Sequence, residues 1–70
     1  MPTKLVHKCG QATSQGADFP TVWHTVLKRD PLVAGVPRQR LEGARAFLEI
    51  PLVTGQSLIY DGDVRSFSLE

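Results

Sequence analysis

The chain has 70 residues, a formal net charge of +1, and a composition that is 41% hydrophobic and 21% charged. A chain of this length has room for one hydrophobic core, and this balance lies outside the low-hydrophobicity, high-charge range of disordered proteins. We therefore expect one small folded domain over residues 1–70, which excludes a disordered or multidomain protein.

Cysteine content and apolar runs restrict the cellular setting. Cys9 is the single cysteine, so no internal disulfide can form, whereas small secreted domains usually depend on several. No apolar run has the length of a signal peptide or a membrane span. These features predict a cytoplasmic protein with no membrane partner.

The first part of the chain, residues 1–17, is predicted to hold a short strand and a loop. Residues 5–9 mix apolar and polar side chains, as an edge strand does. Residues 10–16 form a polar stretch with a glycine at each end, which is typical of a flexible loop.

The clearest predicted element is a helix within residues 18–30. Asp18 can accept hydrogen bonds from the first free amides of a helix, and Pro20 suits the first turn because its missing N–H is not needed there. Pro31 then forces the preceding residue out of helical geometry. The apolar residues between these limits recur at helical spacing and form one stripe, Phe19, Val22, Trp23, Val26 and Leu27.

Residues 32–68 are predicted to form antiparallel strands. We expect a short edge strand at 32–36, a polar connection at 38–43, and the main strand at 46–53, where apolar and polar residues alternate. Pro51 lacks an N–H, so it requires a bulge or an open edge. Further strands are expected at 57–60 and 64–68, joined by a hairpin that the Asp61-Gly62 pair indicates.

These elements predict an α+β fold in which one amphipathic helix packs on a three- to four-stranded antiparallel meander sheet. We expect Phe19 and Trp23 to contact one sheet face. The other face would then carry apolar side chains that a monomer of this size does not usually leave in water, so either the first strand or a second copy, in a homodimer, covers them. The residues predicted there are Phe47, Val53, Ile59 and Phe67.

Residues with metal-binding or nucleophilic chemistry are few. His7, Cys9 and His24 do not supply the four ligands, or three and a water, that zinc needs. Cys9 and His24 could form a thiol nucleophile and its base, but a lone cysteine is more often a small buried side chain. We therefore predict no cofactor, no metal site and no catalytic residue, and keep a thiol-dependent enzyme as the third hypothesis.

A basic group is the one candidate site that the sequence offers. Residues 1–40 contain more cations than carboxylates. Four of these cations lie in the last turn of the predicted helix or in the polar connection, where one positive patch could bind phosphate groups: Lys28, Arg29, Arg38 and Arg40. No aromatic residue is interleaved with them to stack on bases, so an ordinary solvated surface is favoured.

No motif identifies an activity. The first hypothesis is a small non-enzymatic module that binds a protein partner, or itself, through an apolar sheet face or an open strand edge, which requires only backbone groups. The alternative is a weak, non-specific nucleic-acid or polyanion binder acting through the basic group. Leu69-Glu70 is a dipeptide that often precedes an affinity tag, so it carries no functional weight at this point.

Overall fold

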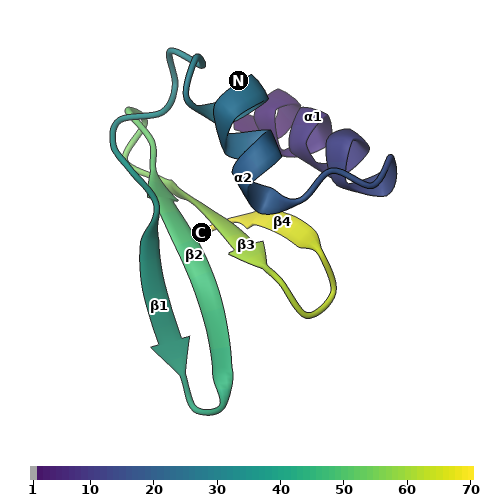
Figure 1. Cartoon of the computed structure of the whole chain (residues 1–70). Coiled ribbons are helices and arrows are strands. Elements are labelled where there is room, and N and C mark those ends of the chain that lie inside the picture. Colours follow the sequence, from purple (N-terminus) through teal and green to yellow (C-terminus); the bar gives the residue numbers. More distant parts are fainter. Residues whose placement is uncertain (1) are drawn as a thin grey trace.

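The structure, a computed structural model, describes residues 2–70. Two helices, α1 (Pro2–Ser14) and α2 (Phe19–Val22), precede the strands, and α2 continues directly into a π-helical turn, η1 (Trp23–Leu27). Four antiparallel strands follow in the spatial order of the sequence: β1 (Arg38–Glu42), β2 (Arg45–Pro51), β3 (Ser57–Asp61) and β4 (Ser66–Leu69). The helices pack on one face of this meander sheet (Figure 1), so the predicted α+β class is confirmed.

Helix α1 replaces the strand and loop that were predicted for residues 5–9 and 10–16, and that prediction is wrong. The buried or partly buried residues of this segment follow helical spacing. The pattern is complete only when a cysteine and a threonine are counted as buried residues. The residues in this pattern are Leu5, Val6, Cys9, Ala12 and Thr13.

Helix α1 ends at a glycine that the sequence interpretation assigned to a loop. Gly16 has a φ of 95°, in the left-handed region. Its N–H donates to the Thr13 carbonyl over 3.0 Å, and the Ala17 N–H donates to the Ala12 carbonyl over 3.0 Å. This pair of bonds satisfies the last helix carbonyls, as in a Schellman motif, and glycine adopts the required backbone at little cost.

The start of α2 is as predicted. One carboxylate oxygen of Asp18 accepts from the Thr21 N–H over 3.1 Å and from the Thr21 hydroxyl over 2.6 Å. Pro20 occupies the first turn, where no amide donor is required. The N-terminal limit of this helical segment was therefore predictable from capping chemistry alone.

The π-helical turn η1 changes which residues of the stripe are buried. The Lys28 N–H donates to the Trp23 carbonyl over 2.7 Å, which spans five residues instead of four. Leu27 therefore lies over Val22, and both are fully buried, while Trp23 and Val26 are only partly buried. Trp23, predicted to contact the sheet face directly, packs at the margin of the core.

The polar connection predicted for residues 38–43 is instead strand β1, a further correction. Gly43 has a φ of 61° and occupies the first position of the two-residue turn between β1 and β2. A glycine at this position is typical of a type II′ hairpin turn. The turn signal was therefore present, but it lay within the segment interpreted as a connection.

The short strand predicted at 32–36 is reduced to a single bridge between Val33 and Leu52. The Ala34 N–H donates to the Pro51 carbonyl over 2.8 Å, so this segment lies beside the end of β2, in line with β1. The hydrogen-bond ladder along this side of β2 is interrupted between residues 32–36 and β1. Pro51, which has no N–H to donate, lies at this interruption, where no donor is required.

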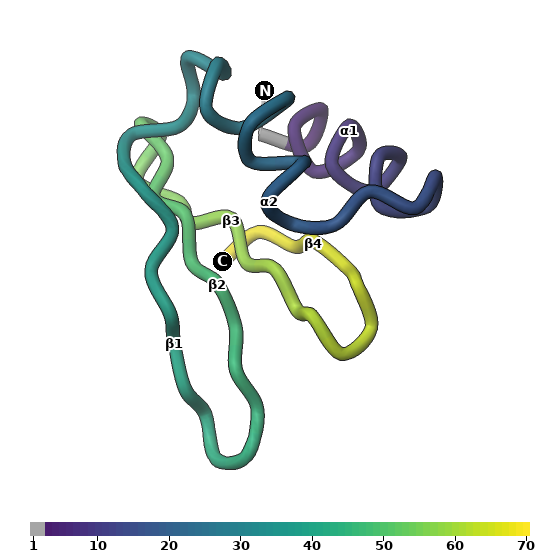
Figure 2. The backbone as a smooth tube through the Cα atoms, in the orientation of Figure 1, coloured from purple at the N-terminus to yellow at the C-terminus, as the bar shows by residue number. Residues whose placement is uncertain are grey.

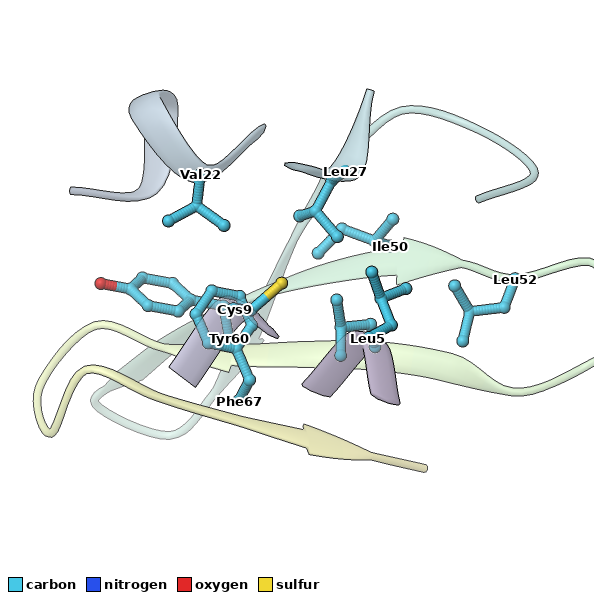
Figure 3. Close-up of a cluster of buried hydrophobic side chains, with 9 residues drawn as sticks. Leu5, Cys9, Val22, Leu27, Ile50, Leu52, Tyr60 and Phe67 are labelled. Carbon is cyan, nitrogen blue, oxygen red and sulfur yellow. The ribbon is translucent and has the colours of Figure 1, made fainter. Parts of the chain in front are cut away.

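The core fills the space between the helices and one sheet face. Figure 3 shows its side chains converging from α1, from the helical segment 19–27 and from β2, β3 and β4. The largest fully buried side chains are Leu5, Cys9, Val22, Leu27, Ile50 and Leu58. Because Phe67 pairs with Tyr60, it lies on this helix-covered face, so its predicted place on the opposite face is wrong.

The opposite sheet face is charged and not broadly apolar, which overturns the prediction of a large uncovered apolar surface. Val53 lies beyond β2 in a loop and is 61% exposed, so only Phe47 and Ile59 of the predicted set belong to this face. Ile59 is nevertheless only 8% exposed. A homodimer stays a prediction, but this face offers it no large apolar surface.

Two arginines organise this charged face. Arg40 forms salt bridges with carboxylates at 2.7, 3.5 and 2.8 Å, those of Glu42, Glu49 and Glu70. Arg45 pairs with Asp61 and, at 3.7 Å, with Asp63, and its guanidinium lies 5.4 Å from the centroid of the Phe47 ring.

Candidate functional site

The four residues of the predicted anion site are divided between the two layers of the fold. Lys28 and Arg29 follow η1 in the helical layer and are exposed. Arg38 and Arg40 alternate with β1 residues that face the helices, so their side chains are on the charged face. Arg40 is already paired with three carboxylates. A phosphate-binding patch of these residues stays a prediction.

Cys9 lies at the centre of the core. Its side chain is fully buried, and the sulfur points into the apolar cluster (Figure 3). Burial, and secondarily the negative charge of Asp30, raise the pKa of the thiol to about 11. Only a small fraction of the thiol is then ionised at neutral pH, and the thiolate is the reactive form. Within residues 2–70, no group of three or more His, Cys, Asp or Glu side chains is placed to hold a metal ion.

The two edges of the sheet differ in chemistry. The β1 edge carries Arg38, Arg40 and Glu42, which are charges of the kind that discourage pairing with a further strand. The β4 edge has the sequence Ser-Phe-Ser-Leu and carries no charge between Ser66 and Leu69. Of the two edges, β4 alone therefore lacks the usual side-chain protection against strand addition.

The hydrogen bonds at the end of β4 show which of its backbone groups face outward. The Ser57 N–H donates to the Glu70 carbonyl over 3.1 Å, and the Glu70 N–H donates to the Ser57 carbonyl over 2.9 Å. In an antiparallel ladder such bonded pairs alternate with non-bonded pairs, so Ser68, opposite Ile59, is again a bonded position. The N–H and C=O groups of the intervening residues, Phe67 and Leu69, consequently point away from β3.

Helix α1 runs beside this edge and forms one wall of an open groove of about 810 Å³. Val6, Gly10 and His7 line the α1 wall, and Phe67 and Leu69 line the β4 side. Figure 2 shows α1 and β4 adjacent, with the β1–β2 hairpin extending away from both. The outward-facing amides of β4 therefore lie next to a partly apolar groove.

Aromatic rings pack against one another on the β4 side of the groove. The ring centroid of Phe67 lies 4.8 Å from that of Tyr60 and 6.3 Å from that of Phe19, while Phe19 and Tyr60 are 5.0 Å apart. These distances are typical of favourable aromatic pairs. The contact of Phe67 with Phe19 joins β4 to α2, and its contact with Tyr60 joins β4 to β3.

Gly10 leaves the α1 wall open at its middle. A β-carbon at this position would meet no other atom within 4 Å, so neighbouring packing does not require a glycine. Glycine inside a helix costs roughly 0.5–1 kcal/mol relative to alanine. The sequence interpretation missed this groove because it assigned α1 to a strand and a loop, although the helical spacing of α1 and the uncharged β4 segment were both visible.

Comparison with protein-family models, with curated protein sequences and with solved structures finds no match to this chain. Among the described residues, no helix combines the length and the apolar character that crossing a membrane requires. Any function must therefore be argued from the geometry of the domain itself.

Proposed function

We propose that this domain is a non-enzymatic interaction module that binds an extended segment of a partner protein by strand addition to β4. The observation that carries the proposal is the outward direction of the Phe67 and Leu69 backbone groups on an uncharged edge strand beside a groove. Strand addition takes its affinity from main-chain hydrogen bonds and its specificity from pockets for alternate side chains.

The expected affinity of the backbone contacts alone is low. Phe67 and Leu69 offer two N–H and two C=O groups, and each hydrogen bond contributes about 1 kcal/mol net. Four such bonds correspond to a dissociation constant on the order of a millimolar. A micromolar complex therefore requires side chains of the bound segment to bury apolar surface in the groove, against Val6 and Gly10.

Amide hydrogen exchange, followed residue by residue by NMR, tests the proposal. The probe is a capped eight-residue peptide of alternating glutamine and valine, and the control is the same peptide with every second residue replaced by proline. In the free protein we expect the Ser68 amide to exchange slowly and the Phe67 and Leu69 amides to exchange fast. The probe should protect Phe67 and Leu69, whereas the proline control should not. Unchanged exchange at both amides under saturating probe would refute strand addition at β4.

Two variants at one position separate groove filling from helix stability. Gly10→Gln extends a flexible side chain into the groove, while Gly10→Ala adds only a methyl group, and both improve helix propensity. We expect both variants to remain folded and Gly10→Gln alone to weaken probe binding, by tenfold or more. Equal binding by Gly10→Gln and the parent chain would place the probe outside the groove.

A further inference from the structure

The groove lacks acidic groups, although the chain has nearly as many carboxylates as cations. None of the residues that line the groove is Asp or Glu. The chain contains seven carboxylate side chains. Five of them form salt bridges on the charged sheet face, those of Glu42, Glu49, Asp61, Asp63 and Glu70. The other two, Asp18 and Asp30, accept backbone hydrogen bonds at the ends of the second helical segment.

Cations, in contrast, lie both in the groove and in a second hollow beside it. Thr3 and His7 line the groove and also the smaller hollow that adjoins it, and the remaining walls of this hollow are Lys4 and Lys8. Arg65 lines the groove at the β3–β4 turn. Within residues 2–70, no salt bridge engages Lys4, Lys8 or Arg65, so their charges are available to a ligand.

From this separation of charge we infer that the segment bound at β4 is acidic: an extended peptide whose glutamate or aspartate side chains meet Lys4 and Lys8 while its backbone pairs with Phe67 and Leu69. The inference rests on the proposed strand addition. β4 spans four residues, about 14 Å of extended chain, so a bound segment of four to six residues covers its full length.

A second copy of this chain fits the groove poorly as the occupant. Its own β4 edge, from Ser66 to Leu69, would supply no carboxylate to meet Lys4 and Lys8. It would also bring the α1 cations of both copies toward one interface, where like charges oppose association. Charge complementarity therefore favours a different, acidic protein segment.

The test compares two capped eight-residue probes that differ only in charge, alternating valine with glutamate in one and with glutamine in the other. Exposed ion pairs are individually weak, so Lys4 and Lys8 together should favour the glutamate probe by about three- to tenfold at 50 mM salt. In 0.5 M salt the two probes should bind with nearly equal affinity. The preference should also vanish in the Lys4→Gln/Lys8→Gln variant, in which the affinity for the glutamine probe stays unchanged.

The control variant is Lys28→Gln/Arg29→Gln, which removes the same charge from the other helical segment. We expect it to keep the full preference for the glutamate probe. Loss of the preference in this variant, or retention of it in Lys4→Gln/Lys8→Gln, would overturn the inference. Equal affinity of the parent chain for both probes, with Phe67 and Leu69 still protected, would overturn it while leaving strand addition intact. Absence of protection by either probe would refute the proposed function as well.

A 12-base-pair DNA duplex, added as a competitor, tests whether any polyanion suffices. An acidic-peptide groove predicts that the duplex leaves the protection of the Phe67 and Leu69 amides by the glutamate probe unchanged, because a duplex cannot pair with a strand edge. Displacement of the probe by equimolar duplex at 150 mM salt would show that these cations bind phosphate, and the acidic-peptide inference would then be wrong.

Discussion

The buried thiol of Cys9 should make the domain sensitive to alkaline pH. Burial raises the thiol pKa from 9.0 to about 11, so the folded state favours the protonated form more strongly than the unfolded state does. The associated stability is fully present below pH 9 and is lost as the pH rises through 11. Two pKa units correspond to about 3 kcal/mol in total, of which roughly half is lost by pH 10 and most by pH 11.

The assay is urea unfolding of the parent chain and of Cys9→Ala, measured from pH 7 to pH 11. Other groups titrate in both proteins, so the difference between the two free energies of unfolding isolates the thiol. At pH 7 the parent should be more stable by about 1–2 kcal/mol, because alanine leaves a small cavity beside Leu5 and Leu27. By pH 11 the order should be reversed. A difference that stays constant across this range would show that Cys9 is solvated or already ionised, and would revive the hypothesis of a thiol nucleophile.

Five further substitutions test other parts of the fold by thermal and urea unfolding. Gly10→Ala should raise the free energy of unfolding by about 0.5–1 kcal/mol, because nothing opposes the added methyl group; a loss of stability would mean that α1 packs more tightly there. Arg65→Gly should be neutral or stabilising by up to about 1 kcal/mol, since Arg65 has a φ of 51°, and clear destabilisation would contradict that backbone geometry. Leu27→Ala should lower the free energy of unfolding by about 3–4 kcal/mol, and Val26→Ala by about 1 kcal/mol. A larger loss for Val26→Ala than for Leu27→Ala would argue for a regular α-helix in place of η1. Asp18→Ala should cost about 1 kcal/mol through loss of the helix cap, and no change would show that the cap is dispensable.

Local chemistry predicted the parts of the fold that depend on neighbouring residues. The capping of Asp18, the hairpin at Asp61-Gly62 and the alternation of β2 each involve contacts within a few positions of the chain. These features require no knowledge of what packs against them. For this reason the antiparallel pairing of β2, β3 and β4 and the start of α2 agree with the sequence interpretation.

The sequence interpretation was wrong where a segment can form either a helix or a strand and tertiary packing decides between them. Residues 5–9 contain a β-branched residue and a histidine, and Gly10 lowers helix propensity, so local propensity alone does not favour α1. Burial of Leu5 and Cys9 against β4 and the helical segment supplies the missing stabilisation. The face of Phe67 was misassigned because a one-residue difference in register moves a side chain to the other face of the sheet.

The candidate groove could not be predicted from the sequence, for a second reason. It lies between α1 and β4, so it could not be assembled while the first segment was interpreted as a strand. The cationic site was predicted because the end of the helix, with Lys28 and Arg29, and the later polar connection, with two arginines, could both lie at one end of the sheet. Lys28 and Arg29 belong to the helical layer and Arg38 and Arg40 to β1, so the sequence alone could not decide whether they form one patch.

The packing of α1 on β4 also has a consequence for synthesis of the chain. Within this domain α1 precedes β4, the strand with the unprotected edge, in chain order, so α1 is translated earlier. At about 5–20 residues per second, α1 is complete roughly 3–10 s before β4 leaves the ribosome. The nascent chain therefore never exposes this edge without its neighbouring helix already made, which limits the time available for a wrong strand to pair with it.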